Sequence, residues 1–305
     1  MSQGKGGRKN RGQHHNKDRI NVGDNGREVL ENIDENNPVI RQFRVYAAEL
    51  DAKHDRYERI FKINRDITIE SKRIIFLLHT IDKESKRDSV LATAKLRLDT
   101  VAKKLFRDIA NELDGQDMYQ FHRAYRAGLE EYVEALTFYE YLENGGCTRD
   151  WITLEEMLTY HVTLKPSEPL ESSDPEGEQN LSHATKITRV LVPPTDYIMG
   201  MADLTGELMR RCINNLAIGD VTSCYHTCNF VRNMYVAFLG YTNACSNEMH
   251  KKVFTLKQSL AKMEKTCYTI KVRGSEIPKH MLADVAIRGT AEDYTTEDDE
   301  GYQAF

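Results

Sequence analysis

Apolar residues recur every three or four positions through most of the chain, which is the period of a helix with one buried face. From residue 40 to 81 this pattern continues without a glycine or a proline, so it predicts one very long helix. Further helices are expected at residues 89–113, 118–142, 195–217, 223–241 and 247–271, with a short one at 153–162. Alternating Val, Ile and Thr appear only briefly, at 187–192. The sequence therefore predicts an all-α, multi-helix bundle of about six or seven helices.

Capping residues indicate where some of these helices begin. Thr153, with Glu156 three residues later, predicts the start of the short helix. Two prolines before Thr195 and Asp196 predict a start there, with one of these two residues as the cap.

Composition divides the chain into a helical domain and polar ends. Residues 1–37 form a basic arm and residues 289–305 an acidic tail, and both are expected to be disordered. The all-α domain is expected at 38–288, interrupted by a flexible acidic loop at 163–188. The basic arm has three open interpretations, which are a nuclear-import signal, a phosphate-binding tail and a plain solvated terminus.

The 305 residues are 40% hydrophobic and carry a formal charge of -5, which argues against a uniformly basic nucleic-acid binder. No uninterrupted apolar stretch reaches the roughly 18 residues of a membrane-spanning helix, so no membrane contact is expected.

The six cysteines are widely spread and are expected to be reduced. Cys224, His226 and Cys228 resemble half of a zinc site, but no second ligand pair follows at finger spacing, and structural thiols are the favoured interpretation.

Two acidic pairs lie at helical spacing in faces that are otherwise small or apolar. Glu131 and Glu134 share one predicted helix, and Asp203 and Glu207 share another. If the two helices face each other, the four carboxylates converge and repel one another unless they share a divalent cation or protons. Hard oxygen ligands suit Mg²⁺ or Mn²⁺. The competing interpretation is that such pairs mark solvated helix faces, while a di-iron site is disfavoured because Glu-x-x-His pairs are missing.

Longer strings carry a family resemblance. The segments ELDAKHDRYER (49–59), RDITIESKR (65–73), EYVEA (131–135), ADLTGELMR (202–210) and KVRGSEIPKHMLA (271–283) resemble the translin-associated factor X family of the translin superfamily. The resemblance extends over about residues 43–285, leaving the basic arm and the acidic tail outside.

The resemblance implies an all-α subunit that assembles with translin into a hollow hetero-oligomer. That complex is a Mg²⁺-dependent endoribonuclease for single-stranded RNA, and it activates the RNA-interference silencing complex by removing the passenger strand. The family's acidic residues fall on Glu131, Glu134, Asp203 and Glu207. We expect Glu134 and Glu207 to hold the metal, and Glu131, Glu134 and Asp203 to act in catalysis.

RNA held near four acids requires basic groups, and Arg123, Arg126, Arg210 and Arg211 flank the acidic pairs. They are candidate nucleic-acid-binding residues, although each could instead neutralise a nearby acid. The same resemblance leads us to expect a cytoplasmic and nuclear protein, with single-stranded DNA and nuclear proteins as further partners. The alternative function is a non-catalytic adaptor that stabilises translin, provides nuclear targeting and recruits nucleic acid.

Overall fold

A computed structural model describes residues 34, 36–147, 149–163, 185–217, 219–240, 246–273, 276 and 281. The chain divides into two compact units, residues 1–54 and 55–305. The expected disordered arm (apart from residues 34, 36 and 37), the acidic tail and the interior of the acidic loop lie outside the described residues. In the first unit, the described chain is mainly the beginning of helix α2 (Pro38–His79), which exposes Val39, Phe43, Val45, Tyr46 and Leu50. The rest of α2 and all the other helices and strands belong to the second unit.

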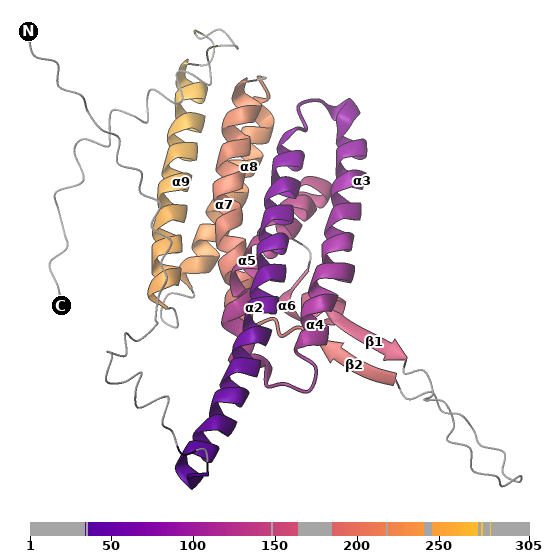
Figure 1. Cartoon of the computed structure of the whole chain (residues 1–305). Coiled ribbons are helices and arrows are strands. Elements are labelled where there is room, and N and C mark those ends of the chain that lie inside the picture. Colours follow the sequence, from indigo (N-terminus) through magenta and orange to yellow (C-terminus); the bar gives the residue numbers. More distant parts are fainter. Residues whose placement is uncertain are drawn as a thin grey trace, which may run out of the picture. The chain divides into compact units, whose positions relative to one another are not determined.

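The all-α prediction is confirmed for the residues described (Figure 1). The long helix α2 matches the expected span closely, because its sequence contains no helix breaker. The other long helices are α5 (Met118–Asn144), α7 (Pro194–Ala217), α8 (Val221–Leu239) and α9 (Asn247–Arg273). None of the described helices is both long enough and apolar enough to cross a bilayer.

The helix expected at 89–113 is a continuous helix that contains a π-helical segment. It consists of α3 (Glu84–Thr100), a π-helical segment η1 (Val101–Phe106) and α4 (Arg107–Glu112). Val101, Ala102 and Phe106 of η1 are all buried in the core. The wider turn therefore lies within the packed core, a feature that apolar periodicity alone did not indicate.

The segment after residue 150 corrects three predictions. The short helix α6 spans only Trp151–Met157, and its cap is Asp150, whose Oδ1 accepts a hydrogen bond from Thr153 N at 2.8 Å, so Thr153 is not the cap. Strand β1 (Thr159–Thr163) follows, where helix was expected up to residue 162. It pairs antiparallel with β2 (Thr185–Arg189), so both ends of the predicted loop at 163–188 are strand. The β-branched residues of these two segments favour pairing over helix.

Two other helix starts use aspartate caps. Asp117 accepts from Tyr119 N at the start of α5, and Asp220 accepts from Ser223 N at the start of α8. Helix α7 differs from the prediction, because Pro194 is already its first residue and Asp196 lies buried in its first turn. Proline suits this position because the first turn leaves its N–H groups unbonded within the helix.

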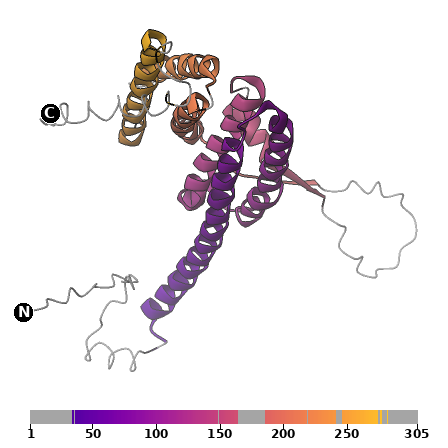
Figure 2. The same ribbon diagram turned by 90° about the horizontal axis from the view of Figure 1, so that it is seen from above.

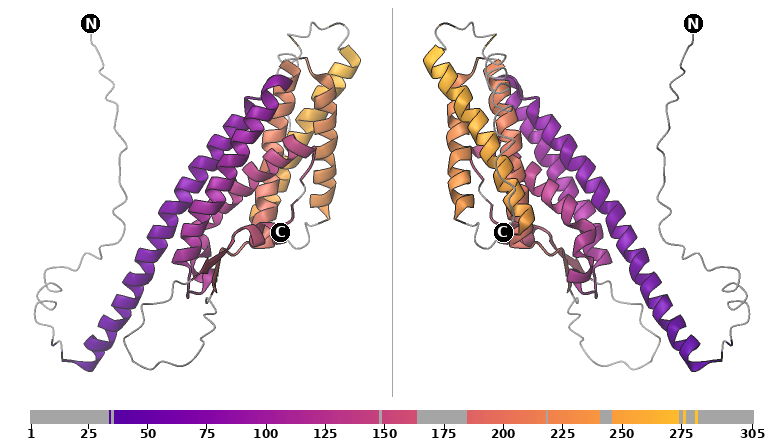
Figure 3. Two further views of the ribbon diagram at one scale, coloured as in Figure 1. Left: turned by 90° about the vertical axis from the view of Figure 1, so that its right-hand side faces the viewer. Right: turned by 90° about the vertical axis from the view of Figure 1, so that its left-hand side faces the viewer.

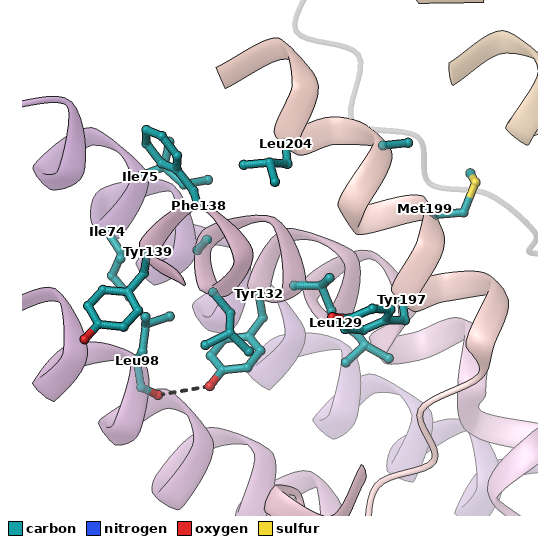
Figure 4. Packing of buried hydrophobic residues seen from close by; sticks show 14 of the residues in the cluster. Ile74, Ile75, Leu98, Leu129, Tyr132, Phe138, Tyr139, Tyr197, Met199 and Leu204 are labelled. Atoms are coloured by element: carbon teal, nitrogen blue, oxygen red, sulfur yellow. Dashed lines mark hydrogen bonds between the residues drawn. The ribbon is translucent and has the colours of Figure 1, made fainter. Parts of the chain in front are cut away.

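Helix α5 provides much of the hydrophobic core. Tyr125, Leu129, Tyr132, Val133 and Phe138 are almost completely buried. Figure 4 shows Tyr132 directed toward α3, where its hydroxyl donates to Leu98 O at 3.4 Å. Helices α7, α8 and α9 lie side by side as a group (Figures 2 and 3), and α7 joins this group to α5. The faces of α5 and α7 that carry the acidic pairs are thus brought into one interface.

Candidate metal and nucleic-acid site

The two acid-bearing helices approach each other closely at a glycine. A Cβ atom built on Gly200 of α7 would lie 2.6 Å from Glu130 O and 2.7 Å from Val133 Cβ on α5. Real Cβ atoms essentially never come this close, so only glycine permits the observed helix approach. Gly206, on the same helix, has nothing within 4 Å of its would-be Cβ. Of these two glycines on α7, only Gly200 sets the approach.

All four predicted acids lie on these two helices, Glu131 and Glu134 on α5 and Asp203 and Glu207 on α7. Burial and, after it, the charges of Asp203, Glu131 and Glu207 raise the pKa of Glu134. Glu131 and Glu207 are about three-quarters buried, with side-chain exposures of 25% and 23%. The structure therefore brings the two pairs into one electrostatic cluster, which we call the acidic cluster (Glu131, Glu134, Asp203 and Glu207).

Three of these acids have cationic or histidine partners from other helices. Lys72 of α2 lies 2.9 Å from Glu131 Oε1, measured from Nζ. His79, the last residue of α2, places Nε2 2.5 Å from Glu207 Oε2. Lys252 of α9 places Nζ 2.7 Å from Asp203 Oδ2. Helices α2 and α9 therefore both contribute to the site.

Lys252 also links the helices to one another. Its Nζ donates to Glu130 Oε2 on α5 at 3.0 Å and to Met199 O on α7 at 3.2 Å. A single ammonium group thus satisfies acceptors from two helices while extending from a third.

Glu134 is the exception in the acidic cluster. Within the described part of the chain it has no ion-pair partner, and it is half-buried. Burial, followed by the charges of Asp203, Glu131 and Glu207, raises the pKa of Glu134 to about 8. Glu207 behaves oppositely, since the hydrogen bond from His79 lowers its pKa. The cluster is therefore short of positive charge at Glu134.

The donor chemistry fits a hard divalent cation, because all four groups are carboxylates. The positions of the described side chains, however, do not form a metal site. Among the described residues, no group of three or more His, Cys, Asp or Glu side chains is arranged to hold a metal ion. Three of the four carboxylates instead contact Lys72, His79 and Lys252. Gathering all four around one ion would require Glu131 and Asp203 to rotate away from Lys72 and Lys252.

The four predicted basic residues occupy different environments. Arg210 is exposed, and its NH1 lies 3.7 Å from Glu207 Oε2. Arg123 is exposed and makes no ion pair with any residue that the structure describes. Arg126 is bound by carboxylates, with Nε 2.9 Å from Glu130 Oε1 and NH2 2.7 Å from Glu248 Oε2. Arg211 is half-buried and donates to Ile81 O at 3.4 Å, and burial lowers its pKa.

Lys72, His79 and Lys252 were not anticipated as part of the site. Lys72 and His79 are seven residues apart on α2, a spacing that places two side chains on one helix face. That spacing was the only available signal, and it is common in helices. Lys252 gave no signal, since its role depends on how α9 packs.

The cysteines that the structure describes are all free thiols. Cys212, Cys224, Cys228 and Cys267 are buried in the contact between α7, α8 and α9. Cys224 Sγ donates to Cys212 O at 3.0 Å. These thiols contribute to helix packing, in agreement with the favoured interpretation of the sequence.

Comparisons with known proteins show which family the chain belongs to. Residues 55–274 match the model of the Translin family. The chain is 44% identical over 262 residues to Translin-associated protein X of Pongo abelii, covering 86% of this chain and 88% of that protein. It is 46% identical over 248 residues to Translin-associated protein X of Mus musculus, covering 81% and 83%.

A solved structure has the same fold. The crystal structure of apo-NeC3PO aligns with a TM-score of 0.50 and 17% identity, covering 73% of this chain and 93% of that one. At this identity the likeness concerns the fold alone. The family match covers most of the chain, and the chain belongs to the Translin family.

Proposed function

We propose that this chain is the catalytic subunit of a Mg²⁺-dependent endoribonuclease that it forms with translin, and that the complex cuts single-stranded RNA. One observation carries the proposal, namely that Glu131 and Glu134 of α5 lie near enough to Asp203 and Glu207 of α7 for the charges of the other three to act on Glu134. Such a cluster is costly to fold unless positive charge compensates it, and of its acids Lys72 and Lys252 contact only Glu131 and Asp203. Glu134, without an ion-pair partner among the described residues, supports a role in binding that cation.

The four acids would have two different roles in the reaction. Glu134 and Glu207 would hold Mg²⁺, or Mn²⁺, whereas Glu131 and Asp203 would orient the attacking water and accept its proton. A bound ion of this kind lowers the pKa of water and neutralises charge on a phosphodiester. Lys72 and Lys252 keep Glu131 and Asp203 in place before substrate arrives. Arg210 and Arg123, both exposed, are the better placed of the predicted arginines to meet RNA phosphates.

Translin is the proposed partner because the relatives that match most of this chain are named Translin-associated protein X. The exposed apolar side chains on α2, including Phe43 and Leu50, offer a surface that a partner subunit would cover. Passenger-strand removal during silencing-complex activation is the proposed biological step. Cytoplasmic and nuclear residence, and binding of single-stranded DNA and nuclear proteins, belong to the same proposal.

The experiment mixes the purified full-length chain with translin, fluorescent single-stranded RNA and Mg²⁺. Each acid of the cluster is replaced singly, as Glu131→Gln, Glu134→Gln, Asp203→Asn and Glu207→Gln. The matched control is Glu264→Gln, since Glu264 is also ion-paired but lies on α9 opposite Arg232. We expect assembled complexes in every case, with cleavage reduced by at least about 100-fold only in the cluster variants. Cleavage that survives the four changes would instead support the adaptor function.

A further inference from the structure

A shallow groove of about 430 Å³ lies between α2 and α3, and its lining combines an aromatic ring with cationic side chains: Lys72, Arg73, Phe76, Leu77, Thr80 and Arg97. Phe76 is 66% exposed, so much of its ring is open to solvent. Leu77 is half-buried beside it. The groove therefore has an apolar surface under a charged rim.

The rim carries a surplus of positive charge. Glu70 is the carboxylate that two guanidinium groups share, with Arg97 Nε 2.6 Å from its Oε1 and Arg73 NH1 3.6 Å from its Oε2. This shared contact holds both arginines at the rim. One carboxylate cannot neutralise two guanidinium groups, so the rim still attracts anions.

Lys72 connects the groove to the acidic cluster. It lines the groove and also lies 2.9 Å from Glu131 Oε1. A ligand in the groove would therefore lie next to the acids of the proposed metal site.

We propose that this groove binds a nucleotide of the single-stranded RNA substrate beside the cleavage site, with its base stacked on Phe76 and its phosphate near Lys72 and Arg73. Stacking on exposed aromatic rings within a positively charged groove is a general way to bind single strands without sequence preference. An acidic peptide could use the cations, but it would have no need for an exposed flat ring. The proposal rests on the ribonuclease function proposed above.

Variants of Phe76 separate stacking from simple apolar contact. Binding of a fluorescein-labelled oligouridylate to the translin-assembled chain is measured by anisotropy in EDTA, which prevents metal-dependent cutting. Phe76→Leu keeps an apolar side chain and loses the aromatic face, so we expect about tenfold weaker binding. Phe76→Trp should bind at least as well as the unaltered chain. Phe254→Leu is the control, because Phe254 on α9 is 60% exposed and lies outside the groove.

An oligomer with abasic sites gives the complementary test. It should bind weakly to the unaltered chain, and its affinity should not change in Phe76→Leu. Arg73→Ala should reduce the salt dependence of binding by about one counterion. The proposal is overturned if Phe76→Leu binds oligouridylate normally or if it weakens both oligomers equally. Loss of translin assembly in Phe76→Leu would also overturn it, because the groove would then be a subunit interface.

Photocrosslinking locates the base directly. RNA containing 5-iodouridine should crosslink to the tryptic peptide 74–83, which contains Phe76, and Phe76→Leu should remove the crosslink. Absence of this crosslink in the unaltered chain contradicts the proposal. The two proposals remain distinguishable, because a crosslinking complex that still cuts RNA after Glu134→Gln would refute only the proposed metal site. Normal binding by Phe76→Leu together with an inactive Glu134→Gln would refute only the groove.

Discussion

His79 Nε2 lies 2.5 Å from Glu207 Oε2, and this contact ties the end of α2 to the acidic cluster on α7. The imidazole is buried, with 5% of its side chain exposed, and its ring packs 4.9 Å from that of Phe138 between centroids. Its Nδ1 is buried without a hydrogen-bond partner among the described residues. A ring held by packing can present its Nε2 proton in one fixed direction, and so it fixes the Glu207 carboxylate.

Replacement of His79 should therefore weaken metal binding. We expect His79→Ala to lower Mn²⁺ affinity about 10- to 100-fold, the usual effect of removing a group that orients a ligand. His79→Gln, which retains an N–H donor, should lose less Mn²⁺ affinity than His79→Ala. Electron paramagnetic resonance of free Mn²⁺ measures the affinity without reference to cleavage.

His122 offers the control for this prediction. It forms a comparable hydrogen bond with the buried Asp196, also between α5 and α7, but outside the acidic cluster. His122→Ala should reduce stability while leaving Mn²⁺ affinity unchanged. Equal losses of affinity in the two alanine variants would show that His79 acts only through general packing.

The raised pKa of Glu134, about 8, predicts how stability depends on pH. The folded chain keeps this proton above the usual carboxyl value of 4.5, so the free energy of unfolding falls as pH rises from about 4.5 to 8. Glu134→Gln removes this fall and should stabilise the metal-free chain at pH 9 by roughly 1–3 kcal/mol. Urea unfolding of the two proteins at pH 5 and pH 9 measures the difference.

Ionisation of Glu134, which lowers stability as pH rises, should raise the affinity for metal. Because the cation requires the carboxylate form, Mg²⁺ affinity should rise toward pH 8 and then level off. Titration calorimetry at pH 7 in buffers of different ionisation enthalpy should detect nearly one proton released per site. A pH-independent affinity with no proton release would contradict the assigned state of Glu134.

Lys252 should matter more for stability than an ordinary surface lysine. Its ammonium group contacts Asp203, Glu130 and Met199 O, and its side chain is only 22% exposed. Lys252→Ala leaves these acceptors without their donor and should cost roughly 1–3 kcal/mol in chemical denaturation. Lys86→Ala, which removes an exposed pair with Asp82, should change stability by less than about 0.5 kcal/mol. Equal effects would mean that Lys252 is not a structural link.

The glycines of α7 give a matched test of the helix approach. Gly200→Ala would force α5 and α7 apart at Glu130 O and Val133, and should destabilise the chain by roughly 2–4 kcal/mol and weaken Mn²⁺ binding. Gly206→Ala meets nothing within 4 Å and should be neutral or stabilising by up to about 1 kcal/mol. Thermal unfolding of both variants provides the comparison, and a harmless Gly200→Ala would refute the close approach.

Much of the fold could be predicted because its long helices follow the helical period, and several of them begin at an aspartate cap or end at a glycine. Helix α5, for example, runs from the Asp117 cap to Gly145, which has a φ of 79°. The hairpin was missed because each strand has five residues, too few for alternation to stand out, and because its pairing joins segments on either side of the acidic loop. The π-helical segment depends on core packing, which apolar spacing does not specify.

The acids of the site were visible in the sequence because Glu131 and Glu134, like Asp203 and Glu207, share a helix face. The residues that pair with these acids could not be predicted from the sequence. Lys72 and His79 come from α2 and Lys252 comes from α9, so their roles follow from tertiary packing that no local pattern contains. The same holds for Arg126, whose contacts with Glu130 and Glu248 join α5 to α9.

The most direct test is a crystal of the chain assembled with translin, soaked in Mn²⁺ and measured at the manganese absorption edge. We predict an anomalous peak between α5 and α7 with carboxylate oxygens of Glu134 and Glu207 about 2.0–2.3 Å away. His79 should remain bonded to Glu207, while Lys72 and Lys252 move away from the ion. A complex that cuts RNA in Mn²⁺ but shows no peak at this position would contradict the account.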